Sequence, residues 1–292
     1  MNFYTWWWKG KGGIPNLGDA LNPYLINKLG DNVRIKYVDA NPYKECLIFV
    51  LSALKHFKKP NIEKVRKLFR FNNYNLCIGS ILQNCNGQTV WGSGFMNAND
   101  TLLKGKFLAV RGYKTQQRLI ELGFQAPTIV GDPALLLPLI YTPHISKKYN
   151  YCIIPHISEY DFFMRKETKC PIINLQTDEI EKTIDQIYAC KMVFSTSLHG
   201  IIIAHAYNIP AIWIKEGNIG TDGFKFEDYF SSVGIPSHQA FNKNIIKSPY
   251  SSIIEKYKKY IQPEYSRIQD IQRNLLSCSP FPLKKEIKSK FE

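Results

Sequence analysis

The residues from Ser195 to Gly200 combine small hydroxyl side chains with a histidine, directly after the apolar run 192–194. This pattern, followed by a second apolar stretch, predicts a buried strand, a tight turn and a helix. The first backbone N–H groups of a helix have no partner within it, and the helix dipole adds positive potential. The turn therefore favours an anion site in which His199 holds a phosphate or carboxylate and moves a proton. The alternative is an ordinary helix start capped by Ser195 or Ser197.

Further reactive side chains follow other predicted strands or open a predicted helix. They are Asp19, Ser93, Arg111, Asp132 and His156. Because open α/β sheets bind ligands beyond the carboxyl ends of their strands, we expect these residues to surround the mouth of one cleft. Taken singly, each is equally explained as a cap, a turn former, a loop residue or a surface ion-pair partner.

The elements that position these residues alternate between strand and helix, which predicts an α/β fold with parallel sheets covered on both faces. Residues 127–130 and 172–175 are among the predicted strands. A linker rich in Pro, Tyr and Lys at 141–150 divides the pattern. We therefore predict one α/β domain over residues 1–145, a second over 146–242, and a helical segment over 243–292 that packs back on the first domain.

The composition of the 292 residues restricts the class of protein. Hydrophobic residues make up 45% of the chain, as in a globular protein with a core. The seven cysteines are scattered without CxxC spacing, so neither a disulfide framework nor a zinc site is expected. The chain starts without the pattern of a secretory leader, and no apolar run reaches the roughly 18 residues that span a bilayer. We therefore expect a cytoplasmic protein.

A formal net charge of +14 predicts an anionic partner. Nucleic acid, an anionic membrane and a phosphorylated substrate all fit, but the chain carries no recognised nucleic-acid motif. Apolar residues interleave with basic ones in one segment as in an interfacial helix, which predicts peripheral contact with the inner membrane face. Its basic residues are Lys55, Lys58, Lys59, Lys64, Arg66, Lys67 and Arg70. A core-packed helix with a solvated basic face explains the same pattern.

Several motifs, taken in order, resemble the polysaccharide pyruvyltransferase family. They are Asn16-Leu17-Gly18-Asp19-Ala20-Leu21-Asn22, Trp91-Gly92-Ser93-Gly94, Val110-Arg111-Gly112, Gly131-Asp132-Pro133, Pro155-His156 and Ser197-Leu198-His199-Gly200. The resemblance implies two Rossmann-like domains in an arrangement like that of GT-B glycosyltransferases, with the active site in the cleft between them. It also implies phosphoenolpyruvate as donor on the second domain, and a hydroxyl pair of a hexose as acceptor on the first. The acceptor belongs to a lipid-linked oligosaccharide or a polysaccharide.

The resemblance, together with the chemistry of ketal formation, assigns roles to named residues. The catalytic candidates are His199, Asp19 and Arg111; the donor-binding candidates are Arg111, Ser195, Ser197, Leu198, His199 and Lys225; the acceptor-binding candidates are Asn16, Asp19, Trp91, Ser93 and His156. No metal or other cofactor is expected. Many family members have an arginine directly before Leu-His-Gly, where this chain has Ser197, so the donor site must depend on the remaining cations. Trp6, Trp7 and Trp8 are further candidates for stacking on a sugar.

Two other functions fit the same observations. Two Rossmann-like domains with a phosphate-binding helix start would equally serve a glycosyltransferase that uses a nucleotide sugar. The net charge alone would suit a polyanion-binding protein without catalytic activity.

Overall fold

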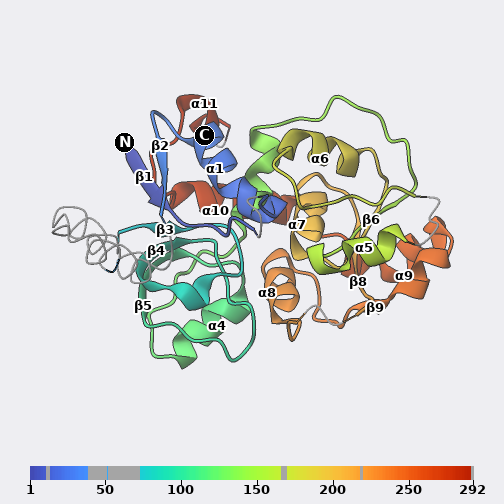
Figure 1. The fold of residues 1–292 in the computed structure, drawn as a ribbon, viewed down its shortest axis with the longest axis horizontal. Helices are drawn as coiled ribbons and strands as arrows, with labels where there is room; N and C mark the ends of the chain where they lie inside the picture. The colour runs from blue at the N-terminus through green and yellow to red at the C-terminus, as the bar shows by residue number, and fades with distance from the viewer. Residues whose placement is uncertain (11–13, 39–50, 52–72, 166–169, 218–219, 291–292) are drawn as a thin grey trace.

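The computed structural model describes residues 1–10, 14–38, 51, 73–165, 170–217 and 220–290, and shows an α/β fold built on parallel sheets (Figure 1). The predicted α/β class with parallel sheets is thereby confirmed, and the GT-B-like arrangement of two domains stays a prediction. The basic segment from Lys55 to Arg70, which we predict to contact membranes, lies outside the described residues. Within the described part of the chain, no helix is both long and apolar enough to cross a membrane.

The first sheet has the strand order β2-β1-β3-β4-β5, with every pair parallel. Its strands are β1 (Asn2–Thr5), β2 (Arg34–Tyr37), β3 (Asn75–Leu76), β4 (Asn86–Trp91) and β5 (Lys104–Ala109). Helix α1 (Leu17–Leu29) connects β1 to β2, and α4 (Tyr113–Glu121) follows β5. The strand predicted at 127–130 is wrong: the segment makes one isolated bridge, between Val110 and Val130. The chain then leaves the sheet at Gly131, whose φ is 153°, and enters the 3₁₀ helix η3 (Pro133–Leu139).

The second sheet has the order β6-β7-β8-β9 and is also parallel. Its strands are β6 (Cys152–Ile154), β7 (Val193–Ser195), β8 (Ala211–Lys215) and β9 (Phe241–Asn242), and its helices are α5 (Tyr160–Met164), α6 (Ile180–Tyr188), α7 (Leu198–Ala206) and α8 (Phe224–Val233). Almost every side chain of α7 is buried, as expected for a helix that is apolar all round. The strand predicted at 172–175 is wrong, since only Ile172 forms a bridge, to Ile153.

Segments far apart in the sequence join the two sheets. The backbone N–H of Leu17, at the start of α1, donates to the carbonyl of Leu175 at 2.6 Å. Asn16 and Gln176 form an antiparallel bridge there. The start of α1 is thus held against the half of the chain that carries the second sheet.

The C-terminal helices are α9 (Tyr250–Ile261), α10 (Tyr265–Ser277) and α11 (Lys285–Lys288). Helix α9 packs on the second sheet, where Ile253 and Ile261 join a core cluster with Phe194. Helix α10 contacts the other half: Trp91 Nε1 donates to the carbonyl of Leu275 at 3.0 Å. Figure 1 shows α10 and α11 on the side of the molecule where β1, β2 and α1 lie. The domain boundaries stay a prediction.

Candidate functional site

The N-terminal ends of two helices from different halves of the chain meet at Gly18 and His199. Gly18 is the second residue of α1 and His199 the second residue of α7. A Cβ atom at Gly18 would lie 2.0 Å from His199 Nδ1, so glycine is required for this approach. His199 Nε2 is buried and has no hydrogen-bond partner among the described residues. The contact therefore places an imidazole with an unused nitrogen where both helix dipoles are positive.

The turn before α7 is held by the hydroxyl groups of Ser195 and Thr196. Ser195 Oγ lies 2.8 Å from the carbonyl oxygens of Ile154 and Ser197, and accepts the Ser197 N–H at 2.9 Å. Thr196 Oγ1 accepts the backbone N–H of His156 at 2.7 Å. Ser197 occupies the N-cap position, but its side chain makes no capping bond. Ser195 thus shapes the turn, while the N–H groups that open α7 have no partner within the helix.

Lys225 of α8 supplies a buried cation beside this turn. Its side chain is 6% exposed, and among the described residues Nζ makes no hydrogen bond and no ion pair. Burial, and then the charge of Arg111, lower the pKa of Lys225 to about 8. A buried ammonium without a carboxylate partner is costly unless an anion compensates it. The site is therefore suited to an anionic ligand.

Two histidines lie within the field of Lys225. Burial, followed by the charges of Lys225 and Arg111, lowers the pKa of His199 to about 3. Burial and Lys225 lower the pKa of His156 to about 4. His156 follows β6, and its Nδ1 lies 2.8 Å from Ser158 Oγ. Both imidazoles are consequently neutral at pH 7, and they offer hydrogen bonds rather than charge in the empty site.

Arg111 lies behind this cluster, fully buried and bonded to protein groups. Its Nε donates to Asp228 Oδ2 at 2.9 Å, Nη1 to Ser80 Oγ at 2.5 Å, and Nη2 to the Phe95 carbonyl at 2.6 Å. Asp228 also accepts the N–H and hydroxyl of Thr115, both at 2.7 Å. Arg111 thus ties α4 and α8 together, and a direct role in holding the donor stays a prediction.

We expect Asp228→Ala to lower the free energy of unfolding by about 3–5 kcal/mol, because the buried guanidinium of Arg111 loses its counter-charge. Chemical denaturation followed by circular dichroism measures this change. The matched control is Asp270→Ala, which removes an exposed ion pair to Arg273 and should cost at most about 1 kcal/mol. Equal losses in the two variants would contradict the importance of the buried pair.

Asp19 lies in the first turn of α1, next to the Gly18 contact with His199. Burial raises the pKa of Asp19 to about 7, although the backbone N–H of Trp8, which donates to Oδ1 at 3.2 Å, opposes the shift. A carboxyl group with a pKa near neutrality is suited to general base catalysis. Asp19 is thus adjacent in sequence to the Gly18 contact with His199, while Lys225 lies close enough to both His199 and His156 to lower their pKa values.

The remaining acceptor-binding candidates differ in their burial and in the hydrogen-bond partners of their polar atoms. Asn16 Oδ1 is buried and has no partner in the described part of the chain. Trp91 and Ser93 are fully buried in the core, and Ser93 Oγ donates to the Cys77 carbonyl at 3.0 Å. Trp7 packs edge-on against Tyr37 at 4.8 Å between ring centroids. Of these groups, only the Asn16 oxygen is left without a partner for a ligand.

Comparison with known proteins identifies the family of the chain. A family model described as polysaccharide pyruvyl transferase matches residues 16–218, more than half of the chain. The chain belongs to this family. It is also 32% identical over 193 residues to an uncharacterised protein of Acanthamoeba polyphaga mimivirus, an alignment that covers 58% of this chain and 63% of that protein. The chain thus spans less than two thirds of the length of this curated relative. No solved structure matches.

Two residues near the candidate site were not predicted from the sequence motifs. Asp228 lies on an amphipathic helix with no local signal that it pairs with Arg111 across 117 positions. Glu159 follows His156 by three residues, and of these two residues the sequence motifs predict only His156 as a candidate for ligand binding. Its position shortly after a predicted strand is the signal that could have identified it.

The Gly18 contact provides a steric test of the site. We expect Gly18→Ala to lower the turnover of the proposed reaction at least tenfold, because the new methyl group would displace the His199 ring. Steady-state kinetics measure the effect. Gly123→Ala is the control: its φ is 83°, so it strains the backbone, but nothing lies within 4 Å of its Cβ. A fully active Gly18→Ala protein would remove His199 from the site.

Proposed function

We propose that the protein transfers pyruvate from phosphoenolpyruvate to a hydroxyl pair of a hexose in a capsular or exopolysaccharide repeat unit, with release of phosphate. The family supports a transferase in polysaccharide biosynthesis. The observation that carries the donor assignment is Lys225, a buried ammonium without a hydrogen bond or ion pair among the described residues, beside two neutral histidines at a helix start. Phosphoenolpyruvate carries the phosphate and carboxylate that such a site requires.

The reaction balances without an oxidant or reductant. A proton is added to the methylene carbon of the donor, and the first sugar hydroxyl attacks C2 as it loses its own proton. The second hydroxyl then displaces the phosphate group, which takes up the proton of this hydroxyl and leaves as hydrogen phosphate, and a cyclic ketal remains. In this scheme Asp19 accepts the proton of a hydroxyl group, and His199 delivers a proton to the donor. Lys225 and the N–H groups at Leu198 and His199 hold the donor anion, while Ser195 and Ser197 form the turn that positions them.

We further propose a GT-B-like arrangement, with the donor on the second sheet and the acceptor approaching from the first. Two parallel sheets joined at the start of α1 support it. The acceptor-binding roles of Asn16 and His156 belong to this proposal. A net charge of +14 supports action on a lipid-linked acceptor at the cytoplasmic face of an anionic membrane.

Product analysis tests the reaction. Purified protein is incubated with phosphoenolpyruvate and a panel of lipid-linked oligosaccharides, and phosphate release and acceptor mass are measured. The expected product has gained the mass of pyruvic acid less water. In parallel samples a nucleotide sugar replaces phosphoenolpyruvate. A gain of one hexose in those samples, with no phosphate release from phosphoenolpyruvate, would overturn the proposal in favour of a glycosyltransferase.

The shifted pKa values predict a bell-shaped dependence of kcat/KM on pH. Asp19 must be deprotonated to act as a base, so the rate rises with pH through about 7. Lys225 must be protonated to hold an anion, so the rate falls as pH rises through about 8. Asp19→Asn should remove the acid limb of the pH profile, and Lys225→Arg should move the alkaline limb of the profile to higher pH. A profile that is the same in all three proteins would contradict both assignments.

A further inference from the structure

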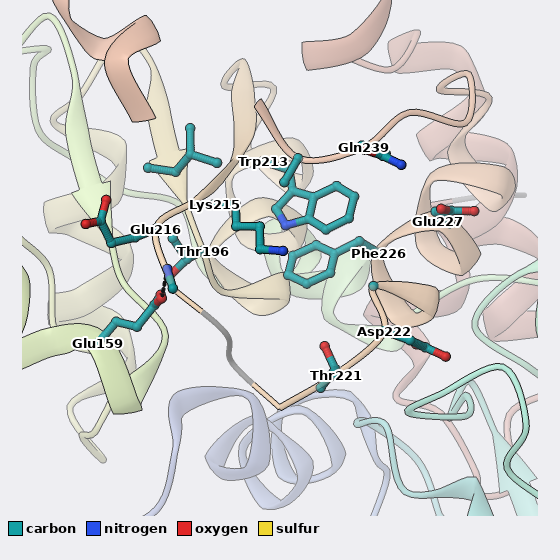
Figure 2. Close-up of a pocket in the computed structure, with 14 residues that line it drawn as sticks. Glu159, Thr196, Trp213, Lys215, Glu216, Thr221, Asp222, Phe226, Glu227 and Gln239 are labelled. Atoms are coloured by element: carbon teal, nitrogen blue, oxygen red, sulfur yellow. Dashed lines mark hydrogen bonds between the residues drawn. The ribbon is translucent and has the colours of Figure 1, made fainter. Parts of the chain in front are cut away.

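A pocket of about 260 Å³ opens at the carboxyl end of the second sheet (Figure 2). The strand ends β7 and β8, the start of α8 and the segment before β9 contribute its walls. Two of these walls adjoin Lys225 and the turn that precedes α7. Thr196 lines the pocket and directly precedes the N-cap Ser197, while Phe226 lines it and directly follows Lys225. A ligand in the pocket would therefore lie beside an anion bound at Lys225.

Four carboxyl groups and one lysine are among the described residues that line this pocket. Figure 2 shows the carboxyl groups of Glu159 and Glu216 on one side of it, and those of Asp222 and Glu227 on the other. Glu227 pairs with Lys114 at 2.5 Å and Glu216 pairs with Lys243. Lys215 is the lysine among the lining residues. Asp222 accepts the backbone N–H groups of Ala98 and Phe224, at 2.7 and 2.9 Å. The pocket therefore offers a ligand both a carboxylate, Glu159, and an ammonium, Lys215, which Figure 2 shows near Trp213 and Phe226.

Two buried polar atoms in this pocket lack partners among the described residues. Glu159 is 8% exposed; its Oε1 accepts the Gly217 N–H at 3.0 Å, but Oε2 accepts nothing. Thr221 Oγ1 is also buried and unpartnered in the described part of the chain. A buried carboxylate oxygen without a hydrogen bond is destabilising, so a ligand that donates hydrogen bonds would be favoured here.

The packing of the aromatic residues in this pocket disfavours the binding of a nucleobase. Trp213 and Phe226 stack on each other, with centroids 4.3 Å apart and planes at 10°. Phe226 is fully buried and Trp213 is 8% exposed. Because these rings already cover one another, no broad aromatic face is left on which a base could stack. The pocket is also slightly smaller than the roughly 300–1,000 Å³ of pockets for drug-sized ligands, which fits one small ring.

We infer that this pocket binds one neutral hexopyranose ring of the acceptor other than the ring that receives pyruvate, which approaches from the first sheet, with Glu159 Oε2 and Thr221 Oγ1 as hydrogen-bond partners of its hydroxyl groups. The inference deepens the proposed function, and the identification of the bound sugar as part of the acceptor rests on that function. Carboxylates that accept from sugar hydroxyls form strong, charge-assisted hydrogen bonds. The two adjoining sites then separate by charge: the anionic donor at Lys225 and the neutral sugar at Glu159.

Binding of methyl hexopyranosides by the full chain tests this inference. Saturation-transfer NMR with a panel of methyl glucosides, galactosides and mannosides should detect at least one ligand. Glu159→Gln keeps an oxygen for the Gly217 N–H but replaces the unpartnered oxygen with an amide nitrogen, and should weaken this binding at least tenfold. Thr221→Val should weaken it less. The matched control Glu121→Gln, at an exposed pair with Arg118, should bind as the wild type does.

The outcomes separate this inference from the proposed function. No hexopyranoside binding by the wild type, or equal binding by Glu159→Gln with its thermal unfolding unchanged, would overturn the sugar pocket. Phosphate release from phosphoenolpyruvate would still test the reaction in either case. Conversely, hexopyranoside binding that is lost in Glu159→Gln supports the pocket even if no pyruvate is transferred. If Glu159→Gln unfolds, Thr221→Val decides: unchanged binding in that variant overturns the inference.

Discussion

Lys225→Met will raise the KM for phosphoenolpyruvate by about 10-fold to 100-fold, since a charge-assisted hydrogen bond to the donor contributes about 1.5–3 kcal/mol. The same substitution should leave the empty protein equally stable or more stable. Lys225 is 6% exposed and lacks a carboxylate partner among the described residues, so methionine removes a buried charge while retaining most of the side-chain volume. Loss of binding together with unchanged or increased stability indicates a residue retained for its ligand.

Steady-state kinetics and thermal unfolding of the same preparations measure both effects. The matched control is Lys182→Met, at an exposed ion pair with Glu179, which should change neither quantity appreciably. Lys225→Arg should retain more donor binding than Lys225→Met because it keeps the charge. A Lys225→Met protein with an unchanged KM and lowered stability would show that the lysine serves the fold alone.

The turn before α7 could be predicted from sequence because its signal is local. The strand that ends at Ser195, the turn and the helix that begins at Leu198 are contiguous, and each follows from the hydrophobic pattern and the small residues between. The parallel sheets follow from the alternation of strands and helices for the same reason. The strands predicted at 127–130 and 172–175 failed because short apolar runs do not reveal whether an adjacent strand is available to pair with.

The partners of the site residues could not be predicted, because they depend on long-range packing. The sequence predicts that Arg111 reaches the donor. In the structure, its guanidinium donates hydrogen bonds to Asp228, Ser80 and the Phe95 carbonyl instead. Trp91 ends β4 and Ser93 follows it, yet both are fully buried. The position of Trp91 along the chain gave no information on whether α10 would contact it.

Lys225 can supply positive charge where the family resemblance leads us to expect an arginine before Leu-His-Gly and this chain has Ser197. A helix start, one buried ammonium and neutral imidazoles supply positive potential without a guanidinium at Ser197. Burial, and then the charges of Lys225 and Arg111, keep His199 neutral. A bound anion would cancel the field of Lys225, so we expect the pKa of His199 to rise when the donor binds. Proton delivery would then begin only after the site is occupied.

His199→Ala is therefore expected to lower kcat by about 10²–10⁴-fold, the usual range for loss of an acid or base, with a smaller change in the KM for phosphoenolpyruvate. The imidazole is replaced by a methyl group at the helix start, and Lys225 still holds the donor. Steady-state kinetics with the acceptor identified by product analysis measure kcat and KM separately. The control is His144→Ala, at an exposed position, which should retain wild-type kinetics.

Two further readouts distinguish proton transfer from a structural role of His199. Added imidazole should partly restore the turnover of His199→Ala, since the vacated space adjoins Gly18 and the buried Nε2 position. His199→Asn, which preserves a hydrogen-bond donor but cannot carry a proton at neutral pH, should be as slow as His199→Ala while its donor KM stays closer to that of the wild type. A His199→Asn protein with near wild-type kcat would show that His199 orients the donor by hydrogen bonding and that another group delivers the proton.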